Sequence, residues 1–90
     1  MESSATLEIV NRLGLHARAA ALLVQTASKF DAEVTIAKDG QTVNGRSIMG
    51  VMMLAAEQGS RIEVAASGRQ AREAVEAIRA LVAARFHESE

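Results

Sequence analysis

A histidine at the start of a predicted helix is the residue of this chain best placed to do chemistry. His16 follows a turn at Asn11 to Gly14, and an alanine-rich run with Arg18 comes after it. A helix N-terminus offers unpaired N–H groups and the positive end of the helix dipole, which together bind anions. A neutral imidazole there has a nucleophilic lone pair, and the arginine supplies charge. The segment predicts that His16 accepts a phosphoryl group.

Both residues also have a purely structural explanation. An ordinary surface histidine at a turn would give the same local pattern as a functional His16. Arg18 would equally be a solvated side chain of the first helical turn, but a cation there opposes the helix dipole. That unfavourable placement is easier to explain if an anion binds beside it.

A serine before a second predicted helix is another candidate site. Ser47 stands directly before the apolar segment 48–56, where serine is a favoured N-cap. Its hydroxyl is also a possible target of phosphorylation, which would add negative charge to the surrounding surface. The two roles are compatible.

The apolar segment after Ser47 carries more apolar side chains than one face of a short helix can bury. We expect Val51 and Leu54 to enter the core. The remaining large side chains are predicted to form an exposed patch of Ile48, Met49, Met52 and Met53. Flexible methionines suit a surface that contacts several partners, so the patch predicts protein docking.

Composition argues against several classes of function. The net charge is −1 and only two of the 90 residues are aromatic, so the chain lacks the charge and stacking platforms of a nucleic-acid binder. No apolar run approaches the roughly 18 residues that span a bilayer, and the first residues lack a signal-peptide pattern. Cysteine is absent and the acidic residues show no metal-site spacing. We expect a cytosolic (cytoplasmic) protein without nucleic-acid partner, membrane insertion, metal or cofactor.

The periodicity of apolar residues predicts four strands and three helices within a single domain spanning residues 1–90. The strands fall at about 6–10, 33–36, 42–44 and 61–66, and the helices at 17–29, 48–56 and 71–86. The Asp39-Gly40 pair suits a two-residue type I′ hairpin, and the polar tail from His87 is expected to fray. The order of elements predicts an α+β two-layer sandwich whose largely antiparallel sheet is covered on one face by helices.

Three segments of the chain, at 14–20, 44–50 and 61–68, resemble HPr, the histidine-containing phosphocarrier of the bacterial phosphotransferase system. The likeness spans Leu7 to Phe86. It implies an open-faced sandwich of a four-stranded antiparallel sheet and three helices in the order βαββαβα, which agrees with the periodicity. It also implies a phosphocarrier in a relay, with no cofactor of its own, rather than an independent catalyst.

The resemblance implies a role for each candidate residue. His16 would accept a phosphoryl group on Nδ1 from phosphorylated Enzyme I and pass it to an EIIA-type protein, while Arg18 would steady the phosphoryl oxygens. Ser47 matches the position that HPr kinase/phosphorylase modifies in some bacteria, where added charge acts as an off switch. Both relay partners would dock on Ala17, Ala21, Ile48, Met49, Met52 and Met53. Rapid exchange of partners suggests a monomer with weak, transient interfaces.

Ala19 departs from the family pattern, because many members have proline directly after the arginine. Proline is tolerated in a first helical turn and makes it rigid, whereas alanine adds an amide donor and good helix propensity. We predict a working site whose phosphohistidine lifetime or transfer rate differs from that of the proline form.

Two other functions fit the predicted elements. A regulatory docking module of the same fold would bind a transcription factor or enzyme without carrying phosphate, but such a protein is expected to lack the active histidine. A small ligand-binding α+β domain fits the element order, yet it does not explain the His-Ala-Arg start of the helix at His16. For the carrier itself, sugar uptake and a nitrogen-related regulatory branch are both open.

Overall fold

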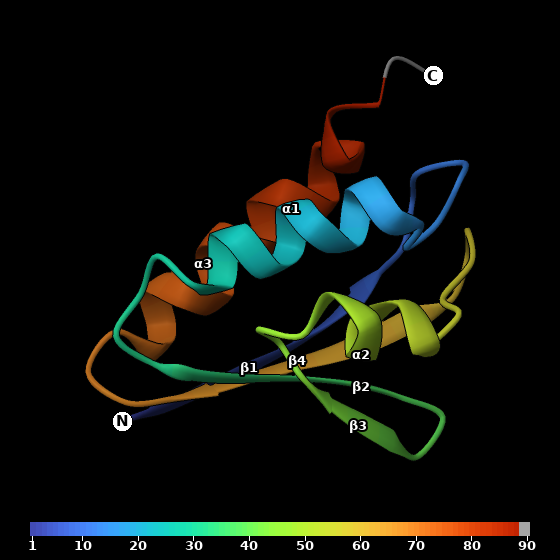
Figure 1. Cartoon of the computed structure of the whole chain (residues 1–90). Helices are drawn as coiled ribbons and strands as arrows, with labels where there is room; N and C mark the ends of the chain where they lie inside the picture. Colours follow the sequence, from blue (N-terminus) through green and yellow to red (C-terminus); the bar gives the residue numbers. More distant parts are fainter. Residues whose placement is uncertain (89–90) are drawn as a thin grey trace.

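An antiparallel sheet with helices on one face makes up the computed structural model of this chain, which describes residues 1–88 (Figure 1). Its elements, in chain order, are β1 (Glu2–Glu8), α1 (Ala17–Ala27), β2 (Glu33–Lys38), β3 (Gln41–Asn44), α2 (Ile48–Met53), β4 (Arg61–Ser67), α3 (Ala71–Ala83) and the short 3-10 helix η1 (Arg85–His87). The predicted α+β sandwich and the order βαββαβα are confirmed.

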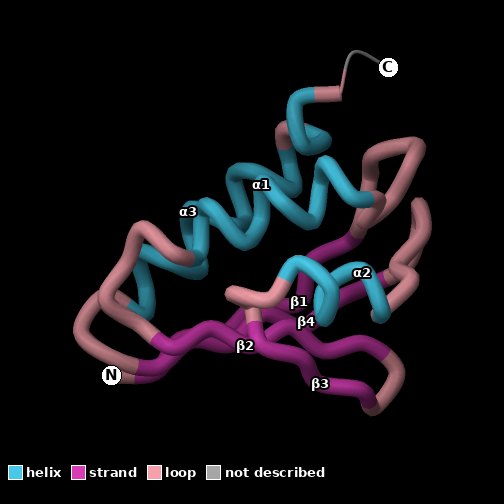
Figure 2. The backbone as a smooth tube through the Cα atoms, viewed as in Figure 1, coloured by secondary structure: helices cyan, strands magenta, loops and turns pink. Residues whose placement is uncertain are grey.

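The strands lie in the order β1-β4-β2-β3, and every neighbouring pair is antiparallel. Figure 2 shows them as one layer with the helices stacked on one side of it. The hairpin between β2 and β3 turns through Asp39 and Gly40, whose φ angles are 51° and 83°. Two positive φ angles are what a type I′ turn requires, so the predicted hairpin is confirmed.

Apolar side chains alternate along the strands and recur at helical spacing along α3, and both sets meet in one core. Ile62, Val64 and Ala66 of β4 are buried, with exposed residues between them. Helix α3 buries Ala71, Ala74, Val75, Ile78, Leu81 and Val82 against the sheet. Each buried Val, Leu or Ile side chain contributes about 1.5–3 kcal/mol relative to exposure, so these two elements hold the layers together.

Several element boundaries differ from the predicted ones. Strand β1 extends back to Glu2, which pairs with Ser67, and it ends at Glu8. Pairing with β4 extends the strand through the polar residues Glu2, Ser3 and Ser4, whose sequence does not alternate between apolar and polar side chains. Helix α1 ends at Ala27, and α2 ends at Met53, earlier than predicted.

The largest difference from prediction lies after α3. The helix ends at Ala83, and Arg85, Phe86 and His87 then take left-handed φ angles of 58°, 53° and 61°. Phe86 is fully buried. Its ring reaches the core from the left-handed turn, whereas we predicted that it would be the last buried position of the helix. Such angles cost about 1–2 kcal/mol per residue without glycine, so tertiary contacts must hold this turn.

The predicted fraying of the tail is wrong for Glu88. Its side chain is only 6% exposed, because the left-handed turn directs it back against the start of α1. The last two residues of the predicted tail, Ser89 and Glu90, lie outside the described part of the chain.

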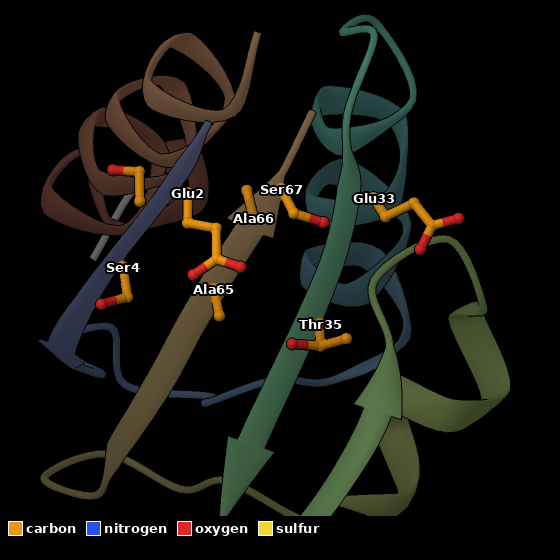
Figure 3. A pocket seen from close by; sticks show the side chains of 8 residues that line it. Glu2, Ser4, Glu33, Thr35, Ala65, Ala66 and Ser67 are labelled. Atoms are coloured by element: carbon orange, nitrogen blue, oxygen red, sulfur yellow. The ribbon is translucent and has the colours of Figure 1, made fainter. Parts of the chain in front are cut away.

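A shallow hollow of about 600 Å³ lies on the face of the sheet that the helices leave uncovered (Figure 3). Small side chains such as Ser4, Thr35 and Ala65 line it together with Glu2 and Glu33. None of the predicted site residues borders this hollow. The chemistry predicted from the sequence therefore lies elsewhere, on the helical side of the molecule.

Candidate functional site

His16 caps the N-terminus of α1 with its own ring. Its backbone is extended (φ −72°, ψ 179°), and Nδ1 accepts a hydrogen bond of 3.1 Å from the Ala19 N–H. Oxygen-bearing side chains usually fill this role. A nitrogen that accepts from an N–H is unprotonated, so the neutral ring carries its proton on Nε2. The Nδ1 lone pair therefore points at the helix N-terminus, where it accepts this hydrogen bond.

Gly14 shapes the turn that delivers His16 to this position. Its φ angle is 67°, and a Cβ added there would collide with the Ala56 carbonyl oxygen. The same carbonyl accepts a hydrogen bond of 2.9 Å from the Leu15 N–H, and Leu15 is buried. Only glycine meets both the left-handed angle and the close approach without strain. The turn thus fixes where α1 begins.

Asn11 braces the turn from inside. It is only 1% exposed, and its Nδ2 donates a hydrogen bond of 2.9 Å to the Gly14 carbonyl oxygen. The same Nδ2 donates a hydrogen bond of 2.6 Å to Oε2 of Glu88. Asn11 thereby links the turn before His16 to the C-terminal end of the described chain.

Glu88 completes a cluster that the sequence pattern did not indicate. Its Oε2 lies 3.3 Å from Nε2 of His16, and the exposed fractions of the two side chains are 6% for Glu88 and 28% for His16. A buried carboxylate therefore faces the ring nitrogen opposite Nδ1. The sequence pattern indicates only a turn at Asn11 and a polar tail at Glu88. No local spacing could have joined residues 77 positions apart.

Two arginines tie the C-terminal turn to the site. Arg18 donates from Nη1 to the Phe86 carbonyl oxygen at 3.2 Å, and Arg85 donates from Nη1 to the Val10 carbonyl oxygen at 2.8 Å. Arg18 stands in the first turn of α1, as predicted, and its side chain has a structural partner there. A guanidinium carries five N–H donors, and this contact uses one of them.

Ser47 is the N-cap of α2, as predicted. Its Oγ accepts a hydrogen bond of 3.0 Å from the Gly50 N–H. A Cβ on Gly50 would lie 3.1 Å from that Oγ and 3.3 Å from Cβ of Val43. Gly50, with no side chain, therefore lets α2 pack closely on β3.

The predicted division of α2 into core and surface is confirmed. Val51 and Leu54 are 0% and 4% exposed, whereas the four remaining large side chains are between 39% and 72% exposed: Ile48, Met49, Met52 and Met53. Helix α2 packs against α1, where Ala17 is exposed and Ala21 is half-buried. Leu13, in the turn before His16, adds an exposed apolar side chain that no periodic pattern indicates.

Two kinds of feature are absent from residues 1–88. No three His, Asp or Glu side chains gather there in a way that could hold a metal ion. No helix in that range has both the length and the apolar character needed to cross a membrane.

Comparisons with known proteins agree with the resemblance seen in the sequence. The family model described as "PTS HPr component phosphorylation site" matches residues 3–84. The phosphocarrier protein HPr of Neisseria meningitidis serogroup A is 48% identical over 85 residues, which cover 94% of this chain and 96% of the relative. The phosphocarrier protein HPr of Xylella fastidiosa (strain Temecula1) is 50% identical over 82 residues, covering 91% and 92% of the two chains.

A solved structure extends the similarity to the fold. The crystal structure of HPr-C-His from Thermoanaerobacter tengcongensis superposes with a TM-score of 0.93 at 44% sequence identity, and covers 98% of this chain and 99% of that one. Identity at this level over nearly the whole length shows common family membership as well as common fold. This chain belongs to the HPr family, the phosphocarriers of the phosphotransferase system.

Proposed function

We propose that this chain receives a phosphoryl group from phosphorylated Enzyme I on Nδ1 of His16 and delivers it to a histidine of an EIIA-type protein. The observation that carries the proposal is the contact between the His16 ring and the start of α1. Because Nδ1 accepts from the Ala19 N–H at 3.1 Å, this nitrogen holds a lone pair while the proton stays on Nε2. Family membership supports the phosphocarrier role in general.

The transfer moves one phosphoryl group between two ring nitrogens. The Nδ1 lone pair of His16 attacks the phosphorus of the donor phosphohistidine, and the breaking P–N bond returns its electron pair to the donor ring. The phosphoryl oxygens then lie where the N–H groups of the first turn of α1 and the Arg18 guanidinium can donate to them. Delivery to the acceptor histidine is the same step with His16 as the donor.

The exposed apolar side chains of α2 are the proposed docking surface for both partners, together with Ala17 and Ala21 of α1. Met49 and Met53 are 72% and 66% exposed, which is unusual for side chains that gain free energy from burial. A small apolar patch of flexible side chains fits partners that bind briefly and in turn. The carrier would act as a monomer.

Ser47 is the proposed regulatory site, modified by an HPr kinase/phosphorylase. Its Oγ is half-buried at the edge of the docking surface and already serves as the helix cap. Phosphorylation would add a charge of about −1.5 to −2 beside Ile48 and Met49. Desolvating that charge would oppose the docking of an apolar partner surface.

Intact-mass analysis with phosphoenolpyruvate, Mg²⁺ and a bacterial Enzyme I tests the proposal. We expect wild-type protein to gain one acid-labile phosphoryl group and His16→Ala to gain none. His87→Ala is the matched control, because His87 is the second of the two histidines of the chain, and it should be charged like the wild type. Folded wild-type protein that stays unmodified with several Enzyme I homologues would refute the carrier function and favour a docking module.

A further inference from the structure

A buried carboxylate faces the back of the His16 ring. Oε2 of Glu88 lies 3.3 Å from Nε2 of His16, and the Glu88 side chain is 6% exposed. Because Nδ1 accepts from the Ala19 N–H, the proton of the neutral ring sits on Nε2, on the side of this carboxylate. The two contacts therefore favour the same tautomer from opposite edges of the ring.

The chain uses several contacts to keep the carboxylate there. After α3 the residues Arg85 to His87 take left-handed φ angles and form a tight turn. Phe86 anchors the turn in the core and its carbonyl oxygen accepts from Arg18. Asn11 then donates to Oε2 of Glu88 at 2.6 Å. The contacts of this turn to the core, to α1 and to the turn before His16 therefore hold the Glu88 side chain in a defined position.

The charge of Glu88 is only partly compensated while the ring is neutral. Within residues 1–88 its second oxygen, Oε1, is buried and has no hydrogen-bond partner. Taking an ionised carboxylate out of water is costly unless an opposite charge lies beside it. Among the described contacts of Glu88, the neutral imidazole and Asn11 each supply an N–H and no charge.

We propose that Glu88 is a positioning residue that also acts as the counter-ion of the phosphorylated His16 ring, an inference that rests on the proposed carrier function. When Nδ1 forms its bond to phosphorus, the ring keeps the Nε2 proton and becomes a phosphoimidazolium cation. The Glu88 carboxylate stabilises that cation. On delivery the P–N bond breaks, its electron pair returns to the His16 ring, and the ring is again neutral with the proton still on Nε2. No proton leaves the site in either direction.

Glu88→Gln tests the charge without changing the shape of the side chain, since a glutamine oxygen can still accept from Nε2. We expect charging by Enzyme I to slow about tenfold, the size of one lost charge-assisted hydrogen bond. Onward transfer should not slow, because the ring loses its positive charge in that step. Glu63→Gln is the matched control. It removes the same charge from an exposed residue of β4 on the uncovered face of the sheet, and it should behave as wild type.

A spectroscopic measurement separates a charge effect on the ring from a general effect on the tail. With ¹⁵N-labelled histidine, the Nε2–H resonance of the phosphorylated wild-type ring should be protected from exchange with water. In Glu88→Gln that protection should fall, while the protein keeps its fold by circular dichroism. A slower rate with unchanged protection of Nε2–H would overturn the proposal, because the charge would then act elsewhere than on the ring.

The outcomes distinguish this inference from the function on which it rests. If wild-type protein is charged and Glu88→Gln is charged at the same rate, the counter-ion role is wrong and the carrier function stands. If folded wild-type protein is not charged at all, the carrier function fails and the counter-ion role fails with it.

Discussion

The backbone N–H of Ala19 donates to Nδ1 of His16 at 3.1 Å, so the nitrogen proposed to accept the phosphoryl group already serves as the cap of α1. Accepting the group must break this hydrogen bond, and the freed N–H can then donate to a phosphoryl oxygen instead. The helix is capped before and after transfer by different atoms of the same residue. The resting hydrogen bond orients the ring. Breaking it on transfer costs little, since a neutral hydrogen bond is worth about 0.5–1.5 kcal/mol net.

Ala19→Pro removes the N–H that holds Nδ1. Because the lone pair no longer has to leave a donor, we expect charging by Enzyme I to become faster by a few-fold, in line with about 0.5–1.5 kcal/mol for one hydrogen bond. The phosphohistidine loses the same donor, so it should hydrolyse faster. Both rates can be followed by intact mass over time. Unchanged charging and hydrolysis in this variant would show that the Ala19 N–H has no part in either state.

Arg18 is expected to do more than hold the C-terminal turn. Arg18→Ala should slow charging about tenfold or more, because a hydrogen bond to a charged phosphoryl oxygen is worth about 1.5–3 kcal/mol. Arg85→Ala is the control, since Arg85 ties the same turn to the Val10 carbonyl oxygen without any proposed contact to the phosphoryl group. Equal losses in the two variants would mean that Arg18 acts only as a tether.

Substitutions of Ser47 separate its cap from its proposed regulatory charge. Ser47→Ala removes the acceptor of the Gly50 N–H and should lower the free energy of unfolding by about 1 kcal/mol, with charging by Enzyme I little changed. Ser47→Asp keeps a good N-cap but adds a negative charge, so stability should be retained while charging slows. Denaturant unfolding and charging rates measure the two effects. Normal charging of Ser47→Asp would contradict the proposed off switch.

The methionines of α2 should affect partner affinity rather than the chemistry of His16. Met49→Glu places a charge on a side chain that is 72% exposed, so we expect little change in the free energy of unfolding. The apparent KM for Enzyme I should rise about tenfold, because docking would desolvate that charge at the interface. Thr42→Glu is the control, because it adds the same charge to an exposed residue of β3. A fall in kcat with an unchanged KM in Met49→Glu would show that the patch does not dock Enzyme I.

Much of the fold was predictable because its signals are local. The alternation in β4, the spacing of buried residues in α3 and the Asp39-Gly40 turn each depend on neighbouring residues. Errors fell where pairing or packing overrides local preference. Strand β1 reaches back to Glu2 only because β4 offers it a partner, and α2 ends before its apolar pattern does.

The sequence by itself determined that His16 stands at a helix start with Arg18 beside it, because a turn containing glycine followed by a run of good helix formers defines that start locally. The tertiary structure alone decided that the His16 ring is the cap of α1 and that Glu88 lies behind it. The contact between Asn11 and Glu88 joins residues 77 positions apart, through a left-handed turn that contains no glycine. Such a turn persists only because burial of Phe86 and the bonds from Arg18 and Arg85 stabilise it, and those contacts exist only once the chain is folded.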